Sequence, residues 1–408
     1  MRALMQPVQP QAPPAPLKRL PLALLAFSLL VAIPSKALAD PGQRATVNVA
    51  HRAARSPTAP IIGAYYYPWY GPSPTESDDD HQWRHVFRCR LQPPQKPLLA
   101  CYSSSDSAVI QQHLQQSRRA GLSFWAVSWW GPDSPTDQTF RRDVLAHPDA
   151  KDFRFAVLYE STGRLGSFDA PDYSRWTSDL AYLAEHYFTQ PNYLKINDRP
   201  VLFVYLTRVY FRQRGAAALE EGRRRFGSVY LVGDDVFGPD YQPAWARPFG
   251  AVTVYDVYGQ SMAIHGATSK AVAALAKNYS AARHAANSAA AAFIPTVAPG
   301  YNDSAVRNGH DGVPRYLVDD PNSREGDLFR AAIQQAALPN LDDRAGRLMM
   351  VTSFNEWYED TQIEPTSGAA PPTTADDSPS GRAMTLGFRY EDYGNLYLDI
   401  LRETAFAP

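Results

Sequence analysis

The sequence has few of the residues that mark several common classes of protein. Only two of its 408 residues are cysteine, and the spacing of Cys89 and Cys101 does not match that of a zinc site. Lys and Arg number 40 against 41 Asp and Glu, so no basic excess indicates a nucleic-acid partner. No phosphate-binding glycine loop and no dinucleotide fingerprint occur. We therefore expect no cofactor, no zinc site and no nucleic acid.

The apolar run near the N-terminus is too short to span a membrane. Residues 20–33 (LPLALLAFSLLVAI) fall short of the roughly 20 residues that a spanning helix needs. A Lys-Arg pair precedes this run and Ala-Leu-Ala at 37–39 follows it, which is the order of a secretory signal peptide. We predict that residues 1–39 are cleaved, that 40–57 are a disordered leader, and that the protein is secreted or periplasmic without membrane attachment. An uncleaved anchor is the alternative.

The two cysteines fit this prediction of export. Cys89 and Cys101 flank a short loop rich in Pro and Gln, and disulfides persist in oxidising compartments. We predict a disulfide between them. The loop-closure argument gives such a bond a stabilisation on the order of 3 kcal/mol.

Eight apolar runs, typical of buried strands, alternate with helical patterns. The runs cover 61–67, 122–127, 153–158, 200–206, 229–232, 251–254, 293–298 and 348–352. The expected helices cover 106–120, 172–188, 216–226, 267–290, 324–337 and 393–404. This alternation predicts an α/β fold, a single (β/α)8 barrel over residues 58–408. An open parallel sheet is the alternative, because the connection between the fifth and sixth runs is short and poor in helix.

Polar and aromatic residues gather where these runs end. In a (β/α)8 barrel the active site lies at the C-terminal ends of the strands. Here nearly every run ends in Tyr, Trp, Asp, Glu or Asn, and the chain has 23 Tyr and 8 Trp. Aromatic faces beside carboxylates suit the binding and cleavage of sugars. The sequence therefore predicts a carbohydrate site at this rim.

The segment 353–365 (SFNEWYEDTQIEP), which follows the last run, carries the densest cluster of acids and aromatics. Glu356 and Glu359 are candidates to flank a glycosidic bond, and Trp357 and Tyr358 offer flat faces to a sugar ring. Residues three apart on a straight strand point to opposite faces, so the two carboxylates converge only if the chain turns after Glu356. An acidic surface turn is the alternative reading of this segment.

Four segments together resemble glycoside hydrolase family 99, the endo-α-1,2-mannosidases and endo-α-1,2-mannanases. Residues 353–365 look like the family segment S-F-N-E-W-H-E-G-T-Q-I-E, and 293–303 with Arg307 look like F-I-P-x-V-x-P-G-Y-x-D-x-x-x-R. Residues 66–71 are similar to Y-Y-x-W-Y-G, and 128–132 to S-W-W-G-P. The matched segments span most of the mature chain.

The resemblance implies a retaining barrel hydrolase without a metal in its chemistry, acting on mannan or high-mannose-type glycans. It assigns Glu356 as the base that deprotonates the sugar 2-hydroxyl, which attacks the anomeric carbon to give a 1,2-anhydro sugar. It assigns Glu359 as the general acid and base. Two positions depart from the motif: Tyr358 replaces a His and Asp360 replaces a Gly. A family H-P-x-Y segment looks like 190–193 here, without its His.

Eight further residues are candidates for substrate binding. They are Tyr66, Trp129, Trp130, Tyr193, Tyr255, Tyr301, Asp303 and Asn355. Core packing is the alternative for the tyrosines, and at least one of the two adjacent tryptophans is structural if both lie on a strand. Glu364 is expected to be structural, and His81 and His85 to lie at the rim. We expect a monomer whose partner is a glycan; a hydrolase for another glycan and a non-catalytic carbohydrate-binding barrel are the alternatives.

Overall fold

The computed structural model describes residues 44–49, 59–71, 83–212, 214–238, 240–259 and 261–405. The predicted signal peptide and its cleavage site lie outside these residues. None of the helices in this described part is long and apolar enough to cross a membrane.

Part of the predicted disordered leader is ordered. Val47 forms an antiparallel bridge with Ile196, and the amide of Ala45 donates to the carbonyl of Asp343 at 2.8 Å. Both apolar side chains are about 95% buried. Because they alternate with polar residues, residues 44–49 can lay one apolar face on the barrel, so the leader prediction is wrong for this segment.

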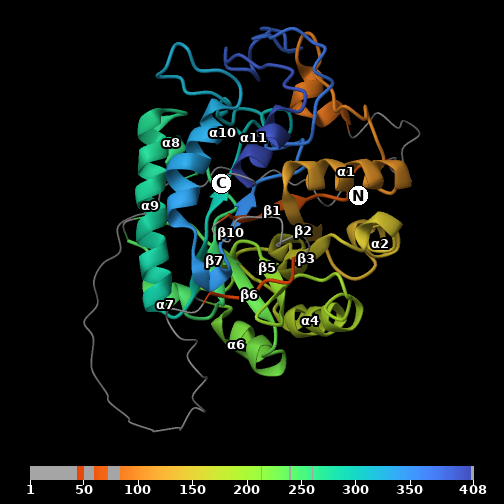
Figure 1. Ribbon diagram of the computed structural model, residues 1–408, viewed down its shortest axis with the longest axis vertical. Coiled ribbons are helices and arrows are strands. Elements are labelled where there is room, and N and C mark those ends of the chain that lie inside the picture. The colour runs from red at the N-terminus through yellow and green to blue at the C-terminus, as the bar shows by residue number, and fades with distance from the viewer. Residues whose placement is uncertain are drawn as a thin grey trace. The chain divides into compact units, whose positions relative to one another are not determined.

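One parallel sheet forms the centre of the protein (Figure 1). Its strands are β1 (Ile61–Tyr66), β2 (Leu122–Trp129), β3 (Arg154–Tyr159), β5 (Arg199–Val204), β6 (Tyr230–Asp234), β7 (Ala251–Thr253), β8 (Ala292–Ile294), β9 (Thr296–Val297) and β10 (Leu348–Val351). They pair in the order β8-β7-β6-β5-β3-β2-β1-β10-β9. The short β4 (Lys195–Ile196) adds an antiparallel partner to β5.

The sheet closes on itself at Pro295. This residue alone separates β8, which pairs with β7, from β9, which pairs with β10. Its carbonyl still accepts the amide of Met350 at 2.9 Å, but proline has no N–H to give to a neighbouring strand. Since β8 and β9 are consecutive pieces of one strand, the two ends of the sheet meet and form an eight-stranded barrel. The predicted fold is confirmed, and the open-sheet alternative is excluded.

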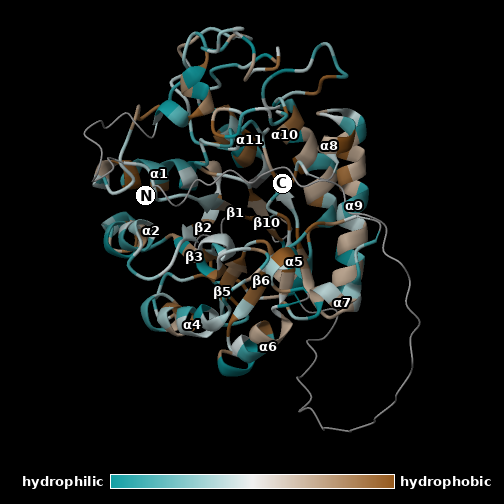
Figure 2. Ribbon diagram, turned by 180° about the vertical axis from the view of Figure 1, so that it is seen from behind, coloured by the Kyte–Doolittle hydropathy of each residue, from teal (hydrophilic) through white to brown (hydrophobic). Residues whose placement is uncertain are grey.

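Helices surround this barrel. The longer ones are α1 (Ser107–Ala120), α4 (Ser174–His186), α6 (Ala216–Arg225), α9 (Ser269–Ser288), α10 (Asp327–Ala331) with its continuation η6 (Ala332–Ala337), and α11 (Leu396–Ala405). Short helices are α2 (Pro135–Gln138), α3 (Ser161–Leu165), α5 (Thr207–Tyr210), α7 (Pro243–Ala246) and α8 (Met262–His265). In Figure 2 the central strands are mostly apolar, whereas α1, α2 and α4 carry many polar residues, as expected of helices with one buried face.

The helix signals in the sequence are visible in α1. The side chain of Asp106 accepts the amide of Ala108 at 2.8 Å and caps the first turn. Gly121 ends the helix with a left-handed φ of 80°, a conformation that glycine adopts at little cost. The face between these caps buries Ile110 and Leu114 against the sheet.

Two long loops lie together beyond the C-terminal ends of the strands (Figure 1). The segment before α1 contains η2 (Trp83–His85) and η3 (Phe87–Arg90), and the second loop runs from β10 to α11. Bridges join Leu91 to Asp376 and Pro97 to Thr366. The loop after β10, which carries the predicted catalytic pair, is therefore held from outside by the segment before α1.

Candidate active site

The chain folds back directly after β10. The amide of Ser353 donates to the carbonyl of Thr361 at 2.8 Å. The amide of the next residue, Phe354, donates to the carbonyl of Tyr65 in β1, also at 2.8 Å. Because residues 353 and 361 are joined in this way, the segment between them forms a compact loop, with Asp360 at a positive φ of 49°. This loop supplies the turn that Glu356 and Glu359 need in order to converge.

The two glutamates lie close enough for each charge to act on the other. Glu356 is 3% exposed, and burial raises its pKa well above the usual range, with the charge on Glu359 adding to the effect. The amide of Tyr358 donates to Oε1 of Glu356 at 3.0 Å and opposes this rise. The pair therefore retains a proton at a pH where exposed carboxylates have lost theirs.

Glu359 is the more accessible of the two, with 22% of its side chain exposed. Burial raises its pKa, and Arg307 opposes that rise most strongly. Nη1 of Arg307 lies 3.4 Å from Oε1 of Glu359 and 2.5 Å from Oδ2 of Asp303. His310 Nδ1 contacts the same oxygen of Asp303 at 3.1 Å. Asp303 thus pairs with Arg307, and its own negative charge also raises the pKa of Glu359.

Tyrosine hydroxyls line the other side of Glu359. Tyr255, just beyond β7, donates to Oε2 of Glu359 at 3.4 Å and accepts a 2.5 Å hydrogen bond from Tyr67. Burial raises the pKa of both phenols well above the usual range, so both remain neutral donors. Asp234, at the end of β6, accepts the amide of Tyr255 at 2.7 Å and thereby fixes this tyrosine; burial raises the pKa of Asp234 to about 7.

A third buried glutamate, Glu160, lies directly after β3. It is 5% exposed and accepts a hydrogen bond from Ser128 at 2.7 Å, while Trp130 Nε1 donates to the same hydroxyl at 3.0 Å. Burial raises the pKa of Glu160 to about 8, and the charge on Glu359 contributes. Glu160 is not among the residues predicted from the sequence, although its position directly after a strand run was a usable signal.

Aromatic rings form one wall beside these acids. The ring of Trp69 lies 4.5 Å from that of Tyr67, 6.3 Å from Trp130 and 6.2 Å from Tyr358. Across the barrel mouth, Tyr301 and Tyr258 pack at 5.2 Å, and burial and the charge on Glu359 raise the pKa of Tyr301. Buried carboxylates between flat aromatic faces are what a glycoside-cleaving site requires.

Comparison with known proteins agrees with this geometry. Residues 58–376 match the family model for glycosyl hydrolase family 99. The chain belongs to this family. It is therefore a glycoside hydrolase, and its (β/α)8 barrel is the fold of that family's solved structures.

Named relatives and a solved structure are similar to this chain. The glycoprotein endo-α-1,2-mannosidase of Rattus norvegicus is 24% identical over 84% of this chain and 74% of that protein. A glycoprotein endo-α-1,2-mannosidase-like protein of Homo sapiens is 24% identical over 74% of this chain and 68% of its own length. The solved family 99 endo-α-mannosidase of Bacteroides thetaiotaomicron has a TM-score of 0.57 at 21% identity, covering 86% of this chain and 96% of that chain.

The structure brings six of the predicted residues together at this rim of the barrel. These are Glu356, Glu359, Trp130, Tyr255, Tyr301 and Asp303. Within the described residues, no group of three or more His, Cys, Asp or Glu side chains is placed to hold a metal ion. Glu160, Tyr67 and Arg307 complete the constellation.

Two of the predicted substrate-binding residues at strand ends point away from the site. Tyr66 is fully buried, stacks on Trp125 at 4.1 Å and contacts His113 Nδ1 through its hydroxyl. Trp129 is also fully buried and donates from Nε1 to Asp137 at 2.7 Å. Because strand side chains alternate, the next residue in each case, Tyr67 or Trp130, faces the site instead.

Tyr193 and Asn355 also have structural roles rather than the predicted substrate contacts. The hydroxyl of Tyr193 donates to the carbonyl of Val201 and accepts the amide of Val157, at 2.7 and 3.0 Å, in the core between β3 and β5. The amide of Asn355 bonds both the N–H and the carbonyl of Tyr67, which ties the catalytic loop to the end of β1.

Glu364 is structural, as predicted. Its carboxylate accepts from Trp357 Nε1 at 2.7 Å and from Tyr102 at 2.8 Å, and contacts His113 at 3.1 Å. It thereby holds the indole of Trp357, which is fully buried, so the prediction that Trp357 offers a flat face to a sugar ring is wrong.

Two further predictions concern the segments before α1. His85 is exposed, while His81 lies outside the described residues. Cys89 and Cys101 are both partly buried and pack against the core, and the disulfide between them stays a prediction.

Proposed function

We propose that this protein is an endo-acting α-mannosidase that cleaves α-1,2 linkages of mannan or high-mannose-type glycans with retention of configuration. The observation that carries the proposal is the pairing of buried Glu356 with partly exposed Glu359 at the C-terminal rim of a family 99 barrel. The relatives named endo-α-1,2-mannosidase support the choice of linkage and sugar. A polysaccharide or oligosaccharide is the partner.

The chemistry assigns one step to each glutamate. Glu356 accepts the proton of the sugar 2-hydroxyl as that oxygen attacks the anomeric carbon, and Glu359 gives its proton to the departing glycosidic oxygen. The product of this step is a 1,2-anhydro sugar. Glu359, now ionised, takes a proton from the water that opens the three-membered ring, while the 2-oxygen recovers its proton from Glu356. Two inversions at the anomeric carbon give net retention.

The proton must be on Glu359 when the bond breaks. Arg307 beside Glu359 favours the ionised form of that carboxyl, whereas Glu356 is buried more deeply and resists ionisation. A 2-hydroxyl that donates to Glu356 favours the ionised form of Glu356. Because the two acids repel when both are ionised, the shared proton then passes to Glu359, where the leaving oxygen needs it.

The test is product analysis. Purified protein incubated with an α-1,2-linked mannan is expected to release oligosaccharides rather than only free mannose, and proton NMR of the first-formed product is expected to show the α anomer. Release of only monosaccharide, or of the β anomer first, would contradict the endo-acting, retaining assignment.

A second candidate is a related hydrolase for another glycan. It is favoured by one observation: Tyr358 stands in the aromatic wall where the family motif has a His, so one contact with the sugar differs. A glycan array probed with the Glu359→Gln protein separates the two, because preferential binding to non-mannose glycans would favour the alternative. Binding without turnover of every glycan tried by the unmodified protein would instead indicate a non-catalytic barrel.

We also propose that the protein is exported. The signal-like segment at 1–39 supports this, and N-terminal sequencing of protein purified from the periplasm or medium tests it. A mature N-terminus at Asp40 is expected, whereas retention of the intact N-terminus in the membrane fraction would indicate an anchor.

A further inference from the structure

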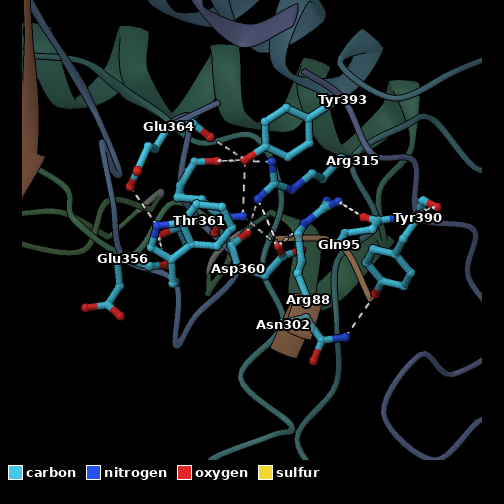
Figure 3. A network of polar contacts seen from close by, with 12 residues as sticks. Arg88, Gln95, Asn302, Arg315, Glu356, Asp360, Thr361, Glu364, Tyr390 and Tyr393 are labelled. Atoms are coloured by element: carbon cyan, nitrogen blue, oxygen red, sulfur yellow. Dashed lines mark hydrogen bonds and ion pairs between the residues drawn. The ribbon is translucent and has the colours of Figure 1, made fainter. Parts of the chain in front are cut away.

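Asp360, the residue after Glu359, is completely buried and bound by arginines. Its Oδ1 atom accepts from Arg88 Nε at 2.6 Å, from Arg315 Nη2 at 2.9 Å and from Gln362 Nε2 at 3.2 Å. Figure 3 shows Asp360 with the two arginines converging on it from separate segments.

The cluster around Asp360 is balanced in charge. Glu325 lies 3.1 Å from Arg88 and 3.8 Å from Arg315, and all four side chains are at most 2% exposed. The ring of Tyr393 packs at 4.9 Å from the guanidinium of Arg88 and at 5.0 Å from that of Arg315. Two cations and two anions give no net charge, which is the condition under which such groups are tolerated out of water.

The backbone next to Glu359 is also held by hydrogen bonds. Arg315 donates to the carbonyls of Asp360 and Gln362 at 2.8 and 3.1 Å, and the amide of Asn302 donates to the carbonyl of Glu359 at 2.8 Å. Peptide groups on both sides of the Asp360 α-carbon are thus fixed. Aspartate is also one of the few residues other than glycine that adopt a left-handed φ readily.

We propose that Asp360 is a positioning residue: by bridging Arg88 and Arg315, it fixes the backbone from which the Glu359 carboxyl reaches the glycosidic oxygen. This rests on the function proposed above. The effect is geometric, because the cluster is neutral and the charged groups that act most strongly on Glu359 are Arg307, Asp303 and Asp256. A displacement of about 1 Å at a catalytic group can lower a rate by about 100-fold.

Two variants that each remove one negative charge from the same cluster test the proposal. Asp360→Asn keeps the side-chain volume and tolerates the left-handed backbone, but weakens the bridge beside Glu359. Glu325→Gln makes the same charge change on the far side of the arginines, 35 positions before Asp360 in the sequence. Both are expected to lower the melting temperature, so stability alone does not distinguish positioning from a merely structural role.

The distinguishing measurement compares two substrates with different needs for an acid. Cleavage of an α-1,2-linked manno-oligosaccharide needs a proton on the leaving oxygen. In the matching mannosyl fluoride the leaving group is a fluoride ion, which departs without being protonated. For Asp360→Asn we expect kcat on the oligosaccharide to fall about 10- to 100-fold, with KM nearly constant and a much smaller loss on the fluoride. For Glu325→Gln the ratio of the two rates is expected to stay within about twofold of the unmodified protein. Equal losses on both substrates in Asp360→Asn would overturn the proposal.

A second readout separates this proposal from the proposed function. If the unmodified protein cleaves neither mannoside, the function is wrong, and hydrogen exchange then decides the positioning claim. Amides of 353–364 are expected to exchange faster in Asp360→Asn than in Glu325→Gln. Equal exchange in the two variants would show that Asp360 does not hold this loop.

Discussion

Arg307 places its Nη1 atom 3.4 Å from Oε1 of Glu359. Among the described residues, the side chain of Glu356 has no comparable ion pair and takes one hydrogen bond, from the amide of Tyr358. The two acids of the pair therefore differ in environment: one is deeply buried, and the other is partly exposed beside a cation. This asymmetry gives each acid a role that pH profiles can separate.

Replacing Arg307 by Gln tests which acid is the proton donor. Loss of the cation raises the pKa of Glu359, because the ionised form loses its main stabilising charge. If Glu359 is the acid, the alkaline limb of the rate–pH profile moves to higher pH. We expect a shift below about 1 pH unit, since Arg307 is half exposed and its charge is screened.

The matched control for this experiment is Arg330→Gln, which removes a partly exposed arginine paired with Glu403. It is expected to leave both limbs unchanged. If Arg307→Gln moves the acid limb instead of the alkaline limb, Glu359 acts as the base and the assigned roles are reversed.

Glu160 is predicted to make the protein less stable as the pH rises. Its pKa is about 8 in the folded protein against about 4.5 for an ordinary glutamate, so between these values the folded state holds a proton that the unfolded state has released. Stability therefore falls as pH rises through this window. Glu160→Gln removes the dependence, and its stability relative to the unmodified protein is expected to rise by about 3 to 5 kcal/mol from pH 4.5 to 8, at about 1.4 kcal/mol for each pH unit.

Urea denaturation at a series of pH values measures this difference. The control Glu220→Gln changes a surface glutamate that is 69% exposed and is expected to track the unmodified protein at each pH. Parallel stability curves for Glu160→Gln and the unmodified protein would show that the Glu160 carboxyl ionises normally.

Tyr66 and Tyr67 are adjacent in sequence and are predicted to give opposite phenotypes. Tyr67→Phe removes the hydroxyl that bonds Tyr255, which in turn contacts Glu359, so kcat is expected to fall about 10-fold for a loss of about 1.4 kcal/mol in the transition state. Tyr66→Phe removes a contact with His113 in the core, and is expected to cost about 1 kcal/mol of stability without changing kcat. Steady-state kinetics and thermal melts of both variants check the pair; a rate loss confined to Tyr66→Phe would contradict the assignment of the two faces.

The repeating pattern of apolar runs and helices was sufficient to predict the barrel, because buried strands and helix caps each depend on a short stretch of sequence. Glu356 and Glu359 were also predictable, since both follow one strand in one segment. The direction of the side chains at the strand ends could not be predicted. Tyr66 and Tyr67 are both aromatic, as are Trp129 and Trp130, so the sequence does not say which member of each pair faces the site.

Long-range contacts could not be predicted from the sequence, for a different reason. Arg88 and Asp360 are separated by 272 positions, and no local pattern joins them. The contact arises only when the segment before α1 packs on the loop after β10. Glu160 lies at the end of a strand run that the sequence shows, but its contact with Ser128 of β2 and its proximity to Glu359 in the loop after β10 exist only in the folded barrel.

The most direct test of the catalytic pair is the rate at which Glu356→Gln releases oligosaccharides from an α-1,2-linked mannan, measured beside the unmodified protein and Glu359→Gln. Glutamine has nearly the same size as glutamate but cannot accept the 2-hydroxyl proton. The account predicts a rate lowered by about 10²- to 10⁴-fold in Glu356→Gln with the fold intact. A rate equal to that of the unmodified protein would contradict it.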